Sequence, residues 1–591
     1  MAGKSLDLHS IIEEDVLASR IVDTYISWET KRDGRVAMWK EVQEYIFATD
    51  TTTTSNSKLP WSNKTTVPKT CQIRDNLHSN YMATLFPNSN WMDWEGSSED
   101  DAAVEKREVI EAYMTWATDR NQFYNTVSRL VLDYIDYGNC FVMPEWIDET
   151  SISPDNQERV GYVGPGLRRI SPLDIVFNPI APHFENSPKI IRSVISMGEL
   201  KELLTQSGVS DEERTSSMAL WDYIKDYRKQ VLDYNGPLQV KDRMMNIAGF
   251  DDYKEYIQCG SVEILTFYGD MYDSENDVFY KNVCIKVVDR HKVFYNKPNP
   301  SYFGYPPIFH AGWRLRPDSL WAMGPLDNLI GMQYRIDHLE NMKADVFDLI
   351  AYPPVKIKGY VEDFTWGPME RIYVGDDGDV ELLSPDVNTL NADTQIQILE
   401  MKMEEMAGSP REAMGFRTPG EKTKYEVQSL ENASSRVYQH KIRHFEDHII
   451  EPGLNAMLEL ARRNMTQTTV RAFDDSLKVA TFSNLTKYDI TGHGRLKPMA
   501  SRHFAEKAAI LQNITGFFNS PAGADEEIKQ HFSSIKLAQT MEKLLEIEEF
   551  KLVTPYIRIS ERADQAREQN NNEEQVLMEM QTPSGLAPGD F

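Results

Sequence analysis

The segment Gly408-Ser-Pro-Arg-Glu-Ala-Met-Gly-Phe-Arg-Thr-Pro-Gly420 lies between long amphipathic stretches and decides how the chain is interpreted. Glycine and proline at both of its ends predict a sharp loop. A helix is expected before it, over 392–407, with Gly408 as a left-handed C-cap residue. Another helix is expected after it from Thr423, an N-cap whose capping-box partner is Glu426. Such a large amount of long, aligned helix is more typical of a protein with a mechanical role than of a catalytic domain.

Another long helix is predicted upstream, over residues 325–351. Pro325 suits the first helical position, and Pro353-Pro354 ends the helix. One face is expected to be dry because apolar residues recur every three or four positions. These residues are Leu329, Met332, Ile336, Leu339, Met342, Val346 and Ile350. The opposite face is expected to be in water, and it carries Asp327, Asp337, Glu340, Asp345 and Asp348.

A β-rich insert is predicted after this helix. Val355-Lys-Ile-Lys358 and Arg371-Ile-Tyr-Val374 have strand-like composition, and Asp376-Asp-Gly-Asp379 is typical of a hairpin turn. The aspartates also suggest a calcium loop, but the spaced acidic ligands and the closing glutamate of such loops are absent. We therefore favour a turn over a metal site.

The helix that follows the loop is predicted to extend to about residue 464. Its apolar stripe consists of Leu430, Ala433, Val437, Ile442, Phe445 and Ile449. Pro452-Gly453 is expected to kink it. Beyond it, residues 488–494 predict a strand and a turn, and 500–518 and 525–550 predict helices.

The amino-terminal half predicts an α/β region. Helices are expected over 10–48, from Pro68 to about Phe86, and over 102–137 with Gly138 ending the last; 50–64 is predicted to be a polar loop or arm. Alternation and β-branched content predict several strands. These are 140–143, 161–163, 174–177, 190–195, 262–268 and 283–288.

Taken in order, these elements resemble the portal, or head–tail connector, proteins of tailed bacteriophages, most closely those of short-tailed phages. Loose motifs add to the resemblance: Ser409-Pro-Arg-Glu-Ala-Met-Gly415 with Glu421-Lys-Thr-Lys-Tyr-Glu-Val427, and Val67-Pro-Lys-Thr-Cys-Gln-Ile-Arg-Asp-Asn76 with Leu85-Phe-Pro87 and Trp91-Met-Asp-Trp94. The resemblance implies an α+β, mainly helical fold with wing, stem, clip and crown regions. Its parts would be an amino-terminal arm and α/β wing (1–324), stem helix (325–351), clip (352–390), second stem helix (391–407), tunnel loop (408–422), long wing helix and return strands (423–499), helical crown (500–561) and polar carboxyl-terminal tail (562–591).

The same resemblance implies a ring of twelve subunits at one capsid vertex, through which the genome is packaged and ejected. The expected partners are other copies of the chain, weakly bound double-stranded DNA, the major capsid protein, the terminase large subunit, and head–tail adaptor and tail proteins. The expected location is the virion, after synthesis in the host cytoplasm. No membrane partner is expected.

Two groups of residues are candidates for these roles. Arg411, Arg417, Lys422 and Lys424 lie in or beside the proposed tunnel loop and are candidates for transient DNA phosphate contacts in the channel. They are also compatible with ordinary solvated cations near helix ends. In the clip, Tyr360, Trp366 and Arg371 are candidates for docking an adaptor or motor.

Composition bounds the interpretation further. A chain of 591 residues is too long for one core. The net charge of −28 disfavours tight DNA binding and suits a channel wall that repels the duplex, although it also suits simple solubility. No signal core or apolar span of membrane length is found, so we expect a soluble protein. The cysteines, Cys71, Cys140, Cys259 and Cys284, lack zinc or disulfide spacing and are expected to be buried free thiols.

Signatures of enzymes are weak. Gly3-Lys4-Ser5 lacks the strand and glycines of a phosphate-binding loop. His440, His444 and His448 are four residues apart and could present imidazoles on one helix face with Glu451, but a solvated or interface row is favoured over a metal site. We therefore expect no enzyme activity, no cofactor and no metal. The alternatives are another virion structural protein of the tail or collar, and a metal-dependent nuclease.

Overall fold

The computed structural model describes most of the chain between residues 14 and 499 and three residues beyond. The described ranges are 14–87, 91–96, 101–152, 158–205, 211–233, 253–273, 277–299, 301, 303–359, 373, 376, 378–383, 392–407, 439–465, 467–474, 479–492 and 494–499, with Ile514, Ala538 and Met541. The predicted crown helices and carboxyl-terminal tail therefore lie almost wholly outside the described residues.

The chain divides into two compact units. The first comprises residues 1–468 and 485–498, and the second comprises 469–484 and 499–591. In the second unit the described part is mainly a hairpin of β14 (Gln467–Asp474) and β15 (Val479–Thr486). All the elements below belong to the first unit.

The described helices reproduce most of those predicted. They are α1 (Glu14–Ile46), the 3₁₀ turn η2 (Ser55–Lys58), α2 (Lys69–Leu85), α3 (Asp101–Arg120), α4 (Phe123–Asp136), α5 (Met197–Thr205), α6 (Asp211–Asp233), α8 (Tyr253–Gln258), α9 (Ile330–Ala351), α10 (Ala392–Ala407), the π-helical turn η4 (Glu446–Ile450) and α12 (Glu451–Asn464). Residues 439–445 are also helical and lead into η4.

The strands form small antiparallel sheets. They are β1 (Met92–Gly96), β2 (Asn139–Ile152), β3 (Glu158–Ile170), β4 (Ile175–Phe177), β5 (Lys189–Ser196), β6 (Ser261–Asp273), β7 (Val278–Val288), β8 (Lys292–Pro298), β9 (Phe309–Gly312), β10 (Arg314–Arg316), β11 (Ser319–Met323), β12 (Val355–Lys358), β13 (Asp379–Leu382) and β16 (Gly494–Pro498). Their orders are β4-β5-β6-β7-β8, β3-β2-β9, β1-β16, β10-β11 and β12-β13. All six predicted strands of the amino-terminal half are confirmed. Strands are abundant, so the expectation of a mainly helical fold holds only loosely.

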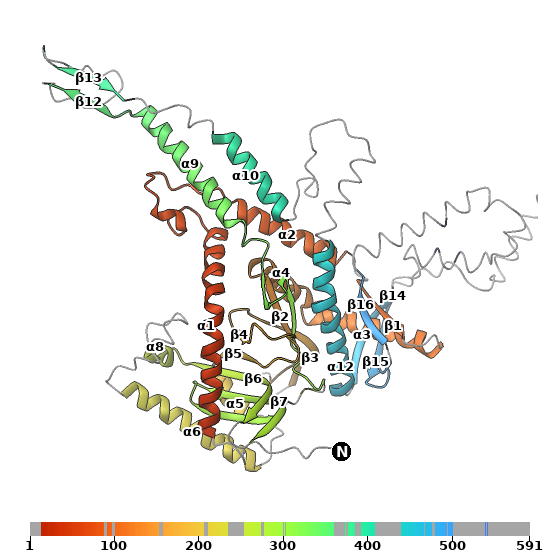
Figure 1. The fold of residues 1–591 in the computed structure, drawn as a ribbon. Coiled ribbons are helices and arrows are strands. Elements are labelled where there is room, and N and C mark those ends of the chain that lie inside the picture. Colours follow the sequence, from red (N-terminus) through yellow and green to blue (C-terminus); the bar gives the residue numbers. More distant parts are fainter. Residues whose placement is uncertain are drawn as a thin grey trace, which may run out of the picture. The chain divides into compact units, whose positions relative to one another are not determined.

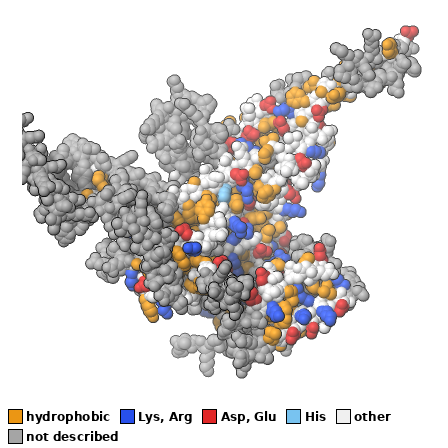
Figure 2. Space-filling view, turned by 180° about the vertical axis from the view of Figure 1, so that it is seen from behind, with side chains coloured by type: hydrophobic (Ala, Val, Ile, Leu, Met, Phe, Trp, Pro, Cys, Tyr) orange, Lys and Arg blue, Asp and Glu red, His pale blue; other side chains and the backbone are white. Residues whose placement is uncertain are grey.

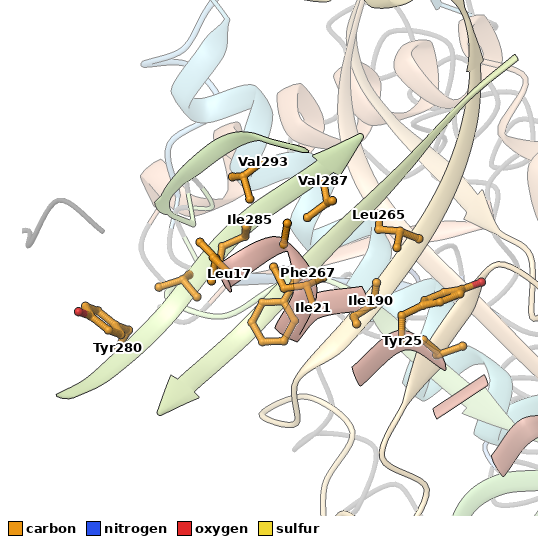
Figure 3. Packing of buried hydrophobic residues seen from close by; sticks show 13 residues of the cluster. Leu17, Ile21, Tyr25, Ile190, Leu265, Phe267, Tyr280, Ile285, Val287 and Val293 are labelled. Atoms are coloured by element: carbon orange, nitrogen blue, oxygen red, sulfur yellow. The ribbon is translucent and has the colours of Figure 1, made fainter. Parts of the chain in front are cut away.

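The five-stranded sheet carries a helix layer on each face. Successive residues of a strand point to opposite faces, and along β6 Leu265 and Phe267 pack against α1 whereas Val262 and Ile264 pack against α5 and α6. Figure 1 shows α1, in red, crossing this sheet. Figure 3 shows its side chains, such as Leu17 and Ile21, among those of the strands.

One predicted helix is two helices in the structure. We expected a single helix over 102–137, but α3 ends at Arg120 and α4 begins at Phe123. Gln122 between them is left-handed, with φ of 55°, which no continuous right-handed helix accommodates. The side-chain amide of Asn121 donates to the carbonyl of Pro165 on β3, 3.0 Å away. This long-range contact holds the break, and helical periodicity alone does not reveal it.

Gly138 ends α4 as predicted, and the structure gives the reason. Its φ is +68°, and a Cβ there would lie 2.3 Å from the backbone nitrogen of Gly324. The two glycines therefore let the start of β2 pass directly against the segment that enters α9. The aromatic pair Trp91 and Trp94 is also buried, as expected of core residues.

The described part of the long helix changes its hydrogen-bonding pattern just before Pro452, where a kink was predicted, and forms a π turn. Proline has no N–H, and its ring crowds the carbonyl four residues earlier. The chain accommodates this with η4 immediately before Pro452, and α12 then continues to Asn464. Ile442, Phe445 and Ile449 of the predicted apolar stripe are buried. Downstream, residues 487–490 form a turn with no strand, and the strand β16 begins only at Gly494.

The π turn buries a carboxyl group that should make stability depend on pH. Glu446 is buried, its Oε1 has no hydrogen-bond partner among the described residues, and burial with the charge of Asp447 raises its pKa from 4.5 to about 8. A raised folded-state pKa means that stability is greatest below the unfolded value of 4.5 and is lost as pH rises toward 8.

Glu446→Gln should therefore raise the melting temperature at pH 8 and have little effect at pH 5, because the amide cannot ionise. A tenfold weakening of an acid corresponds to about 1.4 kcal/mol, which sets the scale of the effect. Thermal melts at both pH values test this, with the exposed Glu405→Gln as the control for loss of one negative charge. A lower melting temperature of Glu446→Gln at pH 8 contradicts it.

Candidate functional site

The segment from α9 to α10 is an antiparallel helix pair joined through the hairpin of β12 and β13. Figure 1 shows the two helices side by side with the hairpin at their far end. Lys343 of α9 binds Asp393 at the start of α10, 2.7 Å apart, which fixes one end of the pair. At the other end, Glu404 of α10 binds Lys69 of α2 at 2.6 Å, and both side chains are buried. The predicted bounds of α10 are confirmed.

The start of α9 differs from the prediction. The helix begins at Ile330, not Pro325, because the preceding residues form a tight turn. In this turn the Gly324 N–H donates to the carboxylate of Asp327 at 3.0 Å, and the Leu329 N–H donates to the carbonyl of Leu326 at 2.8 Å. Leu326 and Leu329 are both fully buried. The buried leucines therefore stabilise a non-helical turn where the first turn of the helix was predicted.

The acidic face of α9 is only partly in water: Asp348 is exposed as predicted, but Asp337 is buried. An extended segment, residues 62–67, lies along it, and we call this segment the strap. Asp337 is fully buried and accepts hydrogen bonds from the Val67 N–H and the Thr66 hydroxyl, both at 3.0 Å. Asp345 accepts the N–H groups of Ser62 and Asn63, both at 2.9 Å.

The side chains that hold the strap recur every four residues along α9. Between the two aspartates, Asn341 bonds both the N–H and the carbonyl of Thr65, at 2.7 and 2.8 Å. Residues 337, 341 and 345 therefore form one row on the helix. This polar row and the Thr/Ser/Asn-rich arm were both visible in the sequence, but the donors come from a region about 270 positions earlier in the chain. No local pattern connects the two.

Asp337→Ala should release the strap. The substitution removes the acceptor of the half-buried Val67 and Thr66 donors, at about 1–3 kcal/mol each as an upper range, and one of the two acceptors of the Gln333 amide. We expect a lower free energy of unfolding and faster hydrogen exchange at 62–67. Asp348→Ala is the matched control, because Asp348 is exposed and accepts only the side-chain amide of Asn63 in the strap. Equal exchange at 62–67 in both variants would overturn the assignment.

The helix pair and its hairpin carry exposed apolar side chains. Phe347 is 51% exposed, Ile350 43% and Tyr352 71%. The others are Leu349, Ile357, Tyr373, Leu382, Leu383, Ile398, Met401 and Met406. Figure 2 shows hydrophobic atoms, in orange, interspersed with charged side chains on this projecting part of the molecule. Large contiguous apolar surfaces mark sites of protein contact. We call the residues named in this paragraph the apolar stem surface.

The hairpin at the tip confirms part of the predicted insert. β12 is the predicted strand Val355–Lys358, and it pairs antiparallel with β13, whose residues we had assigned in part to a turn. Lys356 and Glu381 bind across the pair at 2.9 Å. The expected docking residues Tyr360, Trp366 and Arg371 lie outside the described residues. The same is true of the predicted strand 371–374 except for Tyr373.

The proposed tunnel loop also lies outside the described residues, together with Arg411, Arg417, Lys422 and Lys424. The described chain resumes at residue 439, on the helix that would follow the loop.

The histidine row lies on this helix. The rings of His444 and His448 are 4.0 Å apart, and burial together with the charge of His448 lowers the pKa of His444 to about 4. Among the described residues, no group of three or more His, Cys, Asp or Glu side chains is placed to hold a metal ion. Burial also lowers the pKa of the enclosed His310 to about 3.

Other chemical groups of the described chain are dispersed. A pocket of about 310 Å³ is lined by aromatic side chains, including Phe86, Trp91 and Tyr124, and Asp119 is its single carboxylate. All four cysteines are free; Cys140 and Cys284 are buried as expected, whereas Cys259 is exposed. Among the described residues, no helix has the length and apolar character needed to cross a bilayer.

Comparisons with known proteins give no independent assignment. A scan against models of protein families and a search of curated proteins both found no match for this chain.

Proposed function

We propose that this chain is the portal subunit of a tailed bacteriophage, forming a ring at one capsid vertex through which the genome enters and leaves. The observation that supports this most is the antiparallel pair of α9 and α10, which closes on a β hairpin and carries the apolar stem surface. In a portal, such a pair is the stem, its hairpin is the clip, and neighbouring stems pack around the axis.

The apolar stem surface fits a second copy of the same chain as its occupant. Its residues come from α9, the hairpin and α10, and a head-to-tail contact joins two different surfaces of the same chain. Contacts of this type close into a ring when the rotation per subunit divides the circle. Obligate interfaces of this kind bury roughly 2,000 Å² or more.

The remaining roles follow from the same proposal. The clip docks the terminase large subunit during packaging and the head–tail adaptor afterwards, and the wing faces the major capsid protein. The net charge of −28 keeps the channel wall from holding DNA tightly. The ring resides in the virion.

Native mass spectrometry of the purified full-length chain tests the proposal. We expect one dominant species whose mass is a whole multiple of the 68.0 kDa chain, with twelve as the number that the resemblance implies. A monomer at micromolar concentration contradicts it. Cleavage of DNA in the presence of magnesium would instead favour the nuclease alternative.

A further inference from the structure

The hairpin of β10 and β11 presents a concentration of positive charge in an acidic chain. Arg314 and Arg316, on either side of Leu315, are exposed, as are the following Pro317 and Asp318. The hairpin is anchored by Trp313, which is buried and whose indole N–H donates to the hydroxyl of Tyr81 at 3.2 Å. The buried tryptophan therefore fixes the position of the hairpin that carries the two arginines.

A lysine from the long helix joins them at the same tryptophan. The Lys441 ammonium lies 4.9 Å from the centre of the Trp313 ring, and the Arg314 guanidinium carbon lies 5.2 Å from it. Lys441 also donates a hydrogen bond to the Trp313 carbonyl. One indole thus holds two cations from segments more than a hundred residues apart.

Arg35 of α1 extends the group. Burial lowers the pKa of its guanidinium, the charge of Asp327 opposes this, and the charge of Arg316 lowers it further. Burial and then the charge of Arg314 lower the pKa of Lys441. We call Arg314, Arg316 and Lys441, which the hairpin and the Trp313 ring bring together, the basic cluster, and Arg35 adds a further positive charge near Arg316.

Nearby negative charge does not neutralise the basic cluster. Asp327 faces it, but one of its oxygens already accepts the Gly324 N–H, and Asp318 lies in the hairpin turn. Within the described part of the chain, Arg314, Arg316 and Lys441 form no ion pair. Like charges gathered without partners raise the energy of the free protein, and a polyanionic ligand removes that cost.

We propose that the basic cluster binds the phosphate backbone of double-stranded DNA. Arginine forks match phosphate oxygens in geometry, and contacts of this kind are independent of sequence. The location fits a passing duplex: a short turn from Gly324 to Leu329 joins the hairpin to the stem helix α9, and Lys441 lies on the helix that follows the proposed tunnel loop. This inference rests on the proposed function, and it adds a phosphate site distinct from the loop cations at 411–424.

A second occupant has a different consequence. Carboxylates of a neighbouring copy in the ring would also satisfy the basic cluster, and in that case the cations would stabilise assembly and not bind DNA. The two occupants are separated by measuring assembly and DNA binding on the same samples.

The test compares Arg314→Gln/Arg316→Gln with Lys225→Gln/Lys229→Gln, a control that removes two exposed cations from α6. Binding of a fluorescent duplex of about 30 base pairs is followed by anisotropy from about 50 to 200 mM salt, since phosphate contacts release counterions with a slope of about 0.9 each. Mass photometry records the oligomer in each sample.

We expect the arginine variant to assemble like wild type, to bind DNA about tenfold more weakly at low salt, and to lose about 1 or more from the salt slope. The control and the charge-preserving Arg314→Lys/Arg316→Lys should retain most of the binding. Lys441→Gln should weaken binding in the same direction and tests the cluster from its second element.

Unchanged DNA affinity in the arginine variant, or loss of assembly with unchanged affinity, overturns this inference alone. Absence of a ring in the wild type instead contradicts the proposed function.

Discussion

Phe347→Asp/Ile350→Asp is expected to abolish ring assembly while leaving the subunit folded. Both side chains lie on the exposed distal part of α9, so the substitutions disturb no core of the single chain. In the ring each side chain would be buried against the next subunit, at about 1.5–3 kcal/mol each. An aspartate there must instead lose its hydration without a partner, which costs several kcal/mol more. Every contact around the ring carries the same penalty.

Phe279→Asp/Ile180→Asp is the matched control. These residues are of the same two types and are comparably exposed, at 53% and 75%, but lie outside the apolar stem surface. Mass photometry should find rings in the control and single subunits in the stem variant, with equal melting behaviour of the subunit fold. Rings of normal size from Phe347→Asp/Ile350→Asp would exclude the apolar stem surface as the subunit contact.

The largest loss of stability is expected from Glu263→Gln. Glu263 on β6 is fully buried and binds Arg192 and Arg290, both at 2.7 Å. Arg290 also lies 5.1 Å from the Tyr25 ring of α1, so the network joins the helix to the five-stranded sheet. The neutral amide leaves the buried Arg290 guanidinium without its main counter-charge, at a cost of about 3–5 kcal/mol, whereas the half-buried Arg192 keeps Asp174 at 3.6 Å. The melting temperature should fall by several degrees.

The pH dependence of this effect has a definite sign. Burial acts to raise the pKa of Glu263, but hydrogen bonds and charges of Arg290 and Arg192 outweigh it and hold that pKa below 4.5. A depressed folded-state pKa stabilises the protein above the unfolded value, and this contribution is lost as pH falls. The gap between wild type and Glu263→Gln should therefore be full at pH 7 and shrink on acidification.

A companion substitution separates this account from a general intolerance of the site. Replacing Glu263 and Arg290 together by leucine removes both charges and should cost less than Glu263→Gln if the unpaired arginine is the cause. Equal melting temperatures of wild type and Glu263→Gln at pH 7 would show that the network contributes nothing.

Local pattern was sufficient for much of the fold. The strands β4 to β7 of the five-stranded sheet were predictable from their alternation and β-branched residues, and α1, α2 and α10 from their apolar residues and their flanking glycine and proline signals, whereas β8 was missed. Gly138 was predictable as a stop because only a residue without a side chain accepts its backbone conformation beside Gly324.

The errors share a physical cause: partners distant in sequence. The break at Gln122 depends on Asn121 reaching Pro165, the late start of α9 depends on buried leucines, and the covered acidic face depends on the strap. A row of carboxylates considered alone predicts a solvent-exposed face, because the helix sequence does not identify hydrogen-bond donors from distant parts of the chain. Backbone N–H groups of an extended segment are such donors, and they need acceptors once they are buried.

The candidate site was predictable only in outline. The order helix, hairpin and helix was correct, and Ile350 was assigned to an apolar face. The sequence could not show that the distal end of this face is left uncovered within one chain, since an apolar stripe has the same pattern whether its partner is intramolecular or another copy. The basic cluster was missed for a similar reason: Arg314, Arg316 and Lys441 are ordinary cations until the fold brings them to Trp313.

Negative-stain electron microscopy of the purified full-length chain tests the central claim most directly. If the helix pair α9–α10 exists to line an axial passage, end-on particles should be closed rings with a central hole, and class averages should have one rotational symmetry, twelvefold by the resemblance. Single subunits, open filaments, long tubes or compact particles without a hole would contradict the account.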